Sequence, residues 1–367
     1  MATIKFLMII FYLYKFTIVS PSTNSLSPSS SPKFSALFVF GDSTVDTGNN
    51  MHIPTFLKPN YLPYGQNYTT HLPTGRFSNG KLVPDMLASY LGIKESLPPF
   101  LDPTLSLGDL ITGVNFASSG SGLDDLTSLY SLSIPVSKQI QHFKRYINKL
   151  KLAIGEETVN AIVNSSLVYI SAGANDWLLN YYDIPTRRLT YDVNDYQDFL
   201  LGRIQYFIKE LYEVGCHSII VNGLPPIGSL PFQITWSIDK LFGVDQNKDT
   251  QVYNQNLIKM LHELESTLPG IQLVYADYYT PIIDMIKYPK NYGFIETTKG
   301  CCVERDSEFL SMCSRKLAPC ENPDQYLFWD GVHPTLATYT HIFNYIISDV
   351  IPQFSKNHTY DVNGGGI

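Results

Sequence analysis

Five short apolar segments punctuate the chain, and longer stretches with helical spacing separate them. The segments are rich in β-branched and aromatic residues and do not alternate apolar with polar positions. Continuous hydrophobicity predicts strands covered on both faces, as in a parallel sheet between helices. The predicted strands are ALFVF (36–40), VNFA (114–117), LVYIS (167–171), SIIVNG (218–223) and IQLVYA (271–276).

Apolar positions recur every three to four residues between and after these strands. Residues 140–150, 199–211 and 336–350 each carry an apolar stripe along one helical face. Gly215 is positioned to end the second of these helices. The alternating order predicts a three-layer α/β/α domain with about five parallel strands.

One domain is expected over residues 34–355, with a C-terminal tail at 356–367. No internal repeat or linker interrupts it, and residues 51–80, 95–112 and 225–247 are rich in turn formers and are expected to be loops. Ligands of such folds bind at the carboxyl ends of the strands.

The N-terminus has the pattern of a secretory signal. Lys5 precedes an apolar run from Phe6 to Tyr14, and a stretch rich in serine and proline follows. The run is too short for the ~20 residues of a membrane span, so a membrane anchor is the less favoured alternative. We expect a signal peptide at 1–25, cleaved between 20 and 31, and a secreted protein without a stable membrane span.

Composition adds limits on partners. The chain has 367 residues, 44% of them hydrophobic, and a formal net charge of -7. It carries no block of Lys and Arg, so nucleic acid is not an expected partner. Asn67, Asn164 and Asn357 begin glycosylation sequons, which agrees with export. Nothing in the sequence indicates an oligomeric state.

Four of the five cysteines lie close together before the last helical stretch: Cys301, Cys302, Cys313 and Cys320. In an oxidising compartment they are expected to form two disulfides, and all three pairings stay open. A zinc site is the alternative, but the spacing lacks paired C-x-x-C units. Cys216 is left over and is expected to be a small buried side chain.

Candidate chemistry begins at the end of the first predicted strand. Ser43 lies in FGDSTVDTGNN, and Asp330 and His333 lie in DGVHP near the other end of the chain. A serine hydroxyl needs a base to take its proton, and imidazole can both accept and return one. Asp330 can orient the other ring nitrogen. Two of these residues also have an alternative without chemistry: Ser43 could be a helix cap, and His333 could be an ordinary surface histidine.

Attack by a serine on an ester carbonyl creates an oxyanion that needs hydrogen-bond donors. The candidates are the N–H of Ser43, the N–H of Gly120 and the side-chain amide of Asn175, all near predicted strand ends. Asp42 and Asp176 are expected to hold loops in shape.

Two other hydrolase sites do not fit. The DTG triplet of aspartic proteases occurs at 46–48, but those enzymes need two such carboxylates and no second DTG or DSG exists. The G-x-S-x-G elbow of α/β-hydrolases is absent from the sequence.

The ordered motifs resemble plant-type GDSL esterase/lipases of the SGNH hydrolase superfamily over nearly the whole mature length. The matching blocks are FGDSTVDTGNN, PTGRFSNGKLVPDMLA, GVNFASSGSG, GAND, NGLPPIG and YLFWDGVHPT. The resemblance implies a flavodoxin-like SGNH hydrolase fold and hydrolysis of carboxylic esters without metal or cofactor. It assigns the family's catalytic positions to Ser43, Gly120, Asn175 and His333, with Asp330 as the acid of the triad.

Two alternatives share these motifs. An acyltransferase would use the same acyl-enzyme with an alcohol as acceptor, and a carbohydrate-binding or wall-binding relative would keep the fold without turnover. The expected substrate is a small-molecule or polymer-bound acyl ester. Tyrosines at 61, 64, 68, 181 and 182 could line a cleft or pack beneath loops, and packing is the favoured interpretation.

Overall fold

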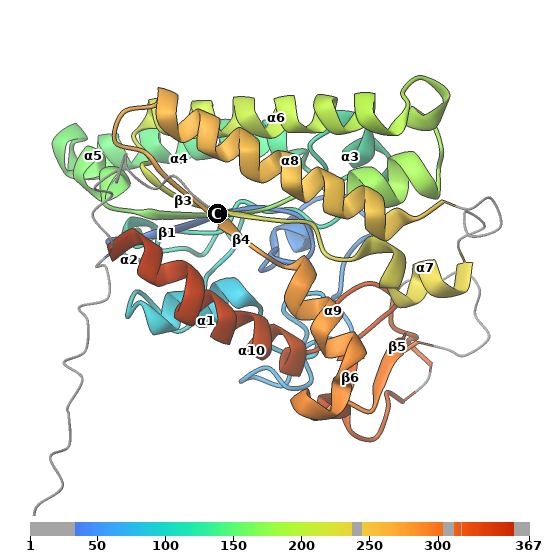
Figure 1. Ribbon diagram of the computed structural model, residues 1–367. Helices are drawn as coiled ribbons and strands as arrows, with labels where there is room; N and C mark the ends of the chain where they lie inside the picture. The colour runs from blue at the N-terminus through green and yellow to red at the C-terminus, as the bar shows by residue number, and fades with distance from the viewer. Residues whose placement is uncertain (1–33, 237–243, 304–311, 317, 356–367) are drawn as a thin grey trace, which may run out of the picture. The chain divides into compact units, whose positions relative to one another are not determined.

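A parallel sheet of four strands lies at the centre of the computed structural model (Figure 1), which describes residues 34–236, 244–303, 312–316 and 318–355. The strands follow one another in chain order, and each pairs in parallel with the next. Every residue of the first two strands is buried, as continuous hydrophobicity predicts. Their bounds are Leu37–Gly41 (β1), Leu167–Ser171 (β2), Ser218–Asn222 (β3) and Gln272–Ala276 (β4).

The remaining predicted strand, residues 114–117, is not a regular strand. It runs beside the free edge of β1, where Asn115 forms an isolated parallel bridge with Val39. The N–H groups of Phe116 and Ser118 donate to the carbonyls of Val39 and Gly41 at 2.7 and 3.0 Å, so the segment still follows β1. The Ala117 N–H between them bonds to the Asn115 side chain at 2.8 Å. If the segment is counted, the strand order is that of the flavodoxin-like sheet.

Helices cover both faces of this sheet, which confirms the predicted three layers. Figure 1 shows α4 (Val136–Ile154), α6 (Val193–Val214) and α8 (Gln246–Thr267) on one side. On the other side lie α1 (Val83–Tyr90) and α10 (Leu336–Tyr345), which contact each other.

The predicted helices agree with the structure. Gly215 ends α6 in the left-handed conformation, with φ of 107°, and its N–H bonds to the carbonyl groups of the last helical turn. The final helix continues beyond α10 through Ile346–Val350, so it spans the predicted stretch.

Further short elements occupy the connections, including two of the stretches that we expected to be loops. They are α2 (Leu107–Ile111), α3 (Asp125–Ser131), α5 (Glu156–Asn164), α7 (Pro231–Trp236), α9 (Tyr279–Lys287), β5 (Glu296–Gly300) and β6 (Tyr326–Phe328). The last two form a separate parallel pair, which the sequence did not predict. This pair leads directly into the DGVHP motif.

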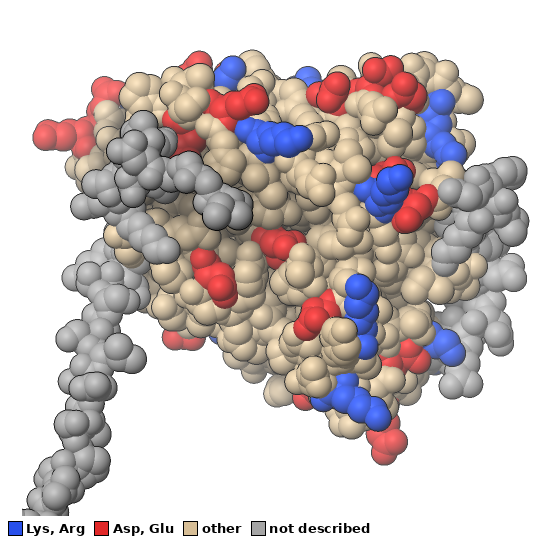
Figure 2. Space-filling view, in the orientation of Figure 1, with Lys and Arg blue, Asp and Glu red and all other residues tan. Residues whose placement is uncertain are grey.

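Basic and acidic side chains are intermixed on the face drawn in Figure 2, and most of the described surface there is uncharged. The predicted signal peptide and C-terminal tail lie outside the described residues.

Candidate active site

Ser43 lies two residues beyond the end of β1, at the carboxyl edge of the sheet. The chain turns sharply there, and Gly41 has φ of 138°. A Cβ at Gly41 would lie 1.8 Å from the carbonyl oxygen of Ser171, so only glycine fits this close approach to β2. The N–H of Asp42 donates to that same carbonyl at 3.0 Å, which fixes the position of the serine after it.

His333 and Asp330 come from the loop between β6 and α10, and the structure brings both to Ser43. The Nε2 atom of His333 lies 2.7 Å from the Ser43 Oγ atom. Its Nδ1 atom lies 2.8 Å from Oδ2 and 2.9 Å from Oδ1 of Asp330. Ser43, His333 and Asp330 therefore form one hydrogen-bonded chain across a sequence separation of 290 residues.

The loop is shaped around the carboxylate. Asp330 Oδ1 accepts the backbone N–H groups of Val332 and His333, at 2.9 and 2.7 Å. The Phe77 ring stacks on the imidazole with centroids 4.5 Å apart, which restrains the ring plane. Asp330 is fully buried and His333 is 7% exposed, so protein groups rather than solvent set the geometry of the pair.

Tyr64 also binds the carboxylate, and sequence reasoning did not assign it to the site. Its hydroxyl donates to Asp330 Oδ2 at 2.7 Å. The expectation that this tyrosine packs beneath a loop agrees with its complete burial, but packing does not describe its polar contact. No sequence signal separates it from the neighbouring tyrosines Tyr61 and Tyr68.

The predicted oxyanion donors are only partly brought together. Asn175 lines the same cavity as Ser43, and its side-chain amide donates to the carbonyl of Ser121 at 2.9 Å. Gly120 is buried with φ of 83° and is not among the described residues that line this cavity. Its place as an oxyanion donor stays a prediction.

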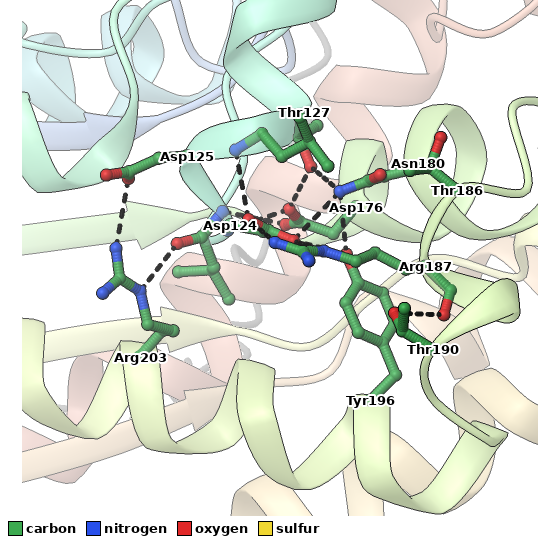
Figure 3. A network of polar contacts seen from close by, with 12 residues as sticks. Asp124, Asp125, Thr127, Asp176, Asn180, Thr186, Arg187, Thr190, Tyr196 and Arg203 are labelled. Carbon is green, nitrogen blue, oxygen red and sulfur yellow. Dashed lines mark hydrogen bonds and ion pairs between the residues drawn. The ribbon is translucent and has the colours of Figure 1, made fainter.

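Asp176 holds the loop behind Asn175, as expected, within the network in Figure 3. Its carboxylate accepts the N–H groups of Leu123 and Asp124 and the hydroxyl of Thr127, at 2.8, 3.0 and 2.6 Å. Asp124 is in turn paired with Arg187 at 2.6 Å. Burial raises the pKa of Asp176 to about 7, although these three hydrogen bonds act to lower it.

Asp42 has a similar role beside Ser43. Its Oδ1 atom accepts the N–H and the hydroxyl of Thr44 at 3.0 and 2.7 Å, which closes the turn that contains Ser43. Burial raises the pKa of Asp42 to about 6, and the bonds from Thr44 oppose that shift.

A mainly apolar cavity opens at Ser43. The enclosed space that a water-sized group can reach is about 50 Å³, and the hollow counted together with its opening to solvent is about 680 Å³. Leucine, isoleucine, alanine, valine, proline and phenylalanine side chains supply most of the wall, among them Leu178, Leu224 and Ile282. Such a lining suits an apolar group attached to the carbonyl that Ser43 would attack.

The cysteines form two disulfides, Cys301 with Cys320 and Cys302 with Cys313, which resolves the three open pairings. Cys216 is buried and unpaired, as expected. No group of three or more His, Cys, Asp or Glu side chains in the described part of the chain is placed to hold a metal ion.

Of the glycosylation candidates, Asn67 and Asn164 lie on the surface, and Asn357 lies outside the described residues. Within residues 34–236, 244–303, 312–316 and 318–355, no helix is long and apolar enough to cross a membrane.

Comparison with known proteins adds independent information. Residues 37–346 match the family described as GDSL-like Lipase/Acylhydrolase. Two GDSL esterase/lipases of Arabidopsis thaliana, At2g30310 and At2g30220, are 47% and 46% identical over 347 residues, covering 93% of this chain and 97% of each relative.

Among solved structures, a catalytic mutant of Axe2, an acetylxylan esterase from Geobacillus stearothermophilus, is similar to this chain. The match covers 86% of this chain and 94% of the Axe2 chain. It is 15% identical with a TM-score of 0.39, which is too distant to bear on substrate. The chain belongs to the GDSL-like lipase/acylhydrolase family of carboxylic ester hydrolases.

Proposed function

We propose that the protein is a secreted serine esterase that works through an acyl-enzyme on Ser43. The observation that carries this proposal is the unbroken chain of contacts from Ser43 Oγ through His333 to Asp330, with distances of 2.7 and 2.8 Å. A base in hydrogen-bond contact with a serine, itself oriented by a buried carboxylate, is the arrangement that nucleophilic acyl transfer requires.

In this mechanism the Ser43 oxygen bonds to the ester carbonyl carbon while its proton passes to His333 Nε2. Asp330 stabilises the imidazolium that forms. The tetrahedral intermediate collapses, and the alcohol leaves with the proton from His333. Water then attacks the acyl-enzyme by the same sequence, which releases the acid and restores the serine.

Oxyanion stabilisation falls to the N–H of Ser43 and the amide of Asn175, with Gly120 as a further candidate. The shared cavity of Ser43 and Asn175 supports the first two. Removing one such donor costs roughly 3–4 kcal/mol of transition-state stabilisation in comparable sites.

The apolar cavity supports an ester with an apolar acyl group as substrate. Secretion is supported by the signal-like N-terminus, by the two disulfides, and by the exposed sequons at Asn67 and Asn164. The mechanism proposed for Ser43, His333 and Asp330 uses no metal or cofactor.

The direct test is Ser43→Ala, assayed with a short-chain p-nitrophenyl ester. We expect kcat/KM to fall about a thousandfold or more, because the nucleophile is lost. Ser171→Ala is the matched control, since Ser171 contacts the same turn through Thr44 at 2.9 Å without touching His333. Its kcat/KM should fall several-fold at most. A folded, secreted Ser43→Ala protein with full activity would falsify the proposal.

A further inference from the structure

The disulfide-bonded loop before DGVHP reaches the catalytic carboxylate through one tyrosine hydroxyl. Tyr64 Oη donates to Asp330 Oδ2 at 2.7 Å, and the backbone N–H of Cys313 donates to Tyr64 Oη at 3.0 Å. Cys313 is in turn disulfide-bonded to Cys302. A continuous set of contacts therefore runs from this disulfide to Asp330, and from Asp330 through His333 to the nucleophile.

The backbone N–H of Cys313 can only donate, and this sets the direction of both hydrogen bonds at the Tyr64 hydroxyl. Because the Tyr64 oxygen accepts the N–H of Cys313, its own proton is available to the carboxylate. Burial and the negative charge of Asp330 raise the pKa of Tyr64 well above its ordinary value, so the hydroxyl stays protonated. A hydrogen bond from a neutral donor to a charged carboxylate is stronger than one between two neutral groups.

Tyr64 and the imidazole share one carboxylate oxygen. Asp330 Oδ2 accepts from Tyr64 at 2.7 Å and lies 2.8 Å from His333 Nδ1. Oδ1 accepts two backbone N–H groups and lies 2.9 Å from the same ring nitrogen. Both Tyr64 and Asp330 are fully buried, so water is not at hand to replace the hydroxyl. The tyrosine thus restrains the rotation of the carboxylate and reduces the charge that Oδ2 presents to the ring.

The tyrosine ring supports the same geometry from a second side. Tyr64 packs edge-on against Phe77 with centroids 5.4 Å apart, and Phe77 stacks on His333. A small apolar cluster, distinct from the main core, surrounds these contacts. Its buried members are Tyr64, Phe77, Cys301, Cys302, Cys313 and Trp329.

We propose that Tyr64 is a positioning residue for Asp330, and that the Cys302–Cys313 disulfide acts on the triad by holding the Cys313 N–H against the Tyr64 hydroxyl. This inference rests on the proposed roles of Ser43, His333 and Asp330. The cysteine loop would then serve catalysis as well as stability.

A pH profile can separate positioning from general stability. Within the described part of the chain, Tyr61, Tyr339 and Asp42 are the other titratable groups that interact electrostatically with the Asp330–His333 pair. Replacing Tyr64 by phenylalanine alters no net charge but withdraws a donor from Asp330. The carboxylate then stabilises a protonated imidazole more strongly, so the acid limb of the kcat/KM profile should move to higher pH.

The primary experiment compares Tyr64→Phe with Tyr61→Phe. Tyr61 is the matched control because its hydroxyl donates to the carbonyl of Cys313 at 2.9 Å, and so binds the same loop without a hydrogen bond to Asp330. For Tyr64→Phe we expect kcat to fall about tenfold with little change in KM, together with the shift of the acid limb. Tyr61→Phe withdraws no donor from Asp330, so its acid limb should move much less than that of Tyr64→Phe.

The disulfide is tested by replacing Cys302 and Cys313 together with serine, and separately by replacing Cys301 and Cys320. We expect the Cys302/Cys313 variant to reproduce the profile of Tyr64→Phe, and the other pair to change thermal stability without moving the acid limb. When Tyr64→Phe is added to the Cys302/Cys313 variant, the fall in kcat should be smaller than the product of the two separate falls, because both changes break the same connection. This arm also keeps the proposal testable if Tyr64→Phe fails to fold.

A folded Tyr64→Phe protein with the parent kcat and acid limb would overturn the inference, as would effects that simply multiply in the combined variant. The proposed function is judged separately. If Ser43→Ala is inactive while Tyr64→Phe resembles the parent, only the positioning role fails, whereas an active Ser43→Ala protein removes the basis for both.

Discussion

Asp42 is a buried acid placed directly before Ser43, and its ionisation opposes folding. Its pKa is raised from 3.8 to about 6, chiefly by burial. A raised folded-state pKa gives stability that is fully present below pH about 4 and is lost as the pH rises through about 6. The folded protein is therefore more stable when the Asp42 carboxyl is protonated than when it is ionised.

Asp42→Asn should remove this dependence. Asparagine keeps an oxygen for the two bonds from Thr44, both of which go to Oδ1. Relative to the parent, the variant should gain up to about 3 kcal/mol in free energy of unfolding between pH 4 and pH 7. Urea denaturation across that range measures the difference, and parallel curves for the two proteins would contradict it.

The sequence predicted that Ser43, His333 and Asp330 would meet, because their motifs taken together favour one catalytic chain, and the hydrogen bonds between them agree. Their catalytic roles stay a prediction. Tyr64 could not be predicted in the same way. Its contact with Asp330 spans 266 residues, and in the sequence it is one of several tyrosines in a turn-rich stretch. Only folding distinguishes the hydroxyl that meets a carboxylate from those that do not.

At the scale of elements, a buried ion pair ties helix α1 to the loop that follows Ser43. Arg76 binds both oxygens of Asp85 at 2.7 Å and donates to the carbonyl of Thr47 at 3.0 Å. Arg76 is 5% exposed and Asp85 is fully buried. Arginine suits this position because its planar group matches the carboxylate with two parallel bonds.

Arg76→Ala should cost about 3–5 kcal/mol in free energy of unfolding, because it leaves the Asp85 carboxylate buried without its partner. Lys81→Ala provides the control, since Lys81 pairs with Glu95 at 3.9 Å on the surface and should cost less than about 1 kcal/mol. Chemical denaturation of both variants gives the comparison. Similar costs would show that the buried pair does not tie the loop to the helix.

Helix prediction succeeded where the apolar stripe was continuous and failed where polar residues interrupted it. α6 was predicted, including its glycine end. α8 was not, although Tyr253, Leu257, Leu261 and Leu264 repeat at helical spacing and are buried. That spacing would have identified it, despite the glutamines, asparagines and charged residues between those positions.

At the scale of the whole molecule, the sheet gathers residues from distant segments at one edge. β1 leads to Ser43 and β2 leads to Asn175, while Asp330 and His333 follow the separate β5–β6 pair. The parallel order was predictable from continuous apolar strands. The disulfide pairing and the β5–β6 pair were not, because both depend on how loops meet in space rather than on local pattern.

The account depends most on Ser43 acting as the nucleophile, which a fluorophosphonate probe can test on the intact protein. Mass spectrometry of the labelled chain should find one adduct, and peptide mapping should locate it on Ser43. Folded His333→Ala protein should label far more slowly, because the serine has lost its base. Ester turnover by a protein whose Ser43 stays unlabelled, or an adduct on a different serine, would contradict the account.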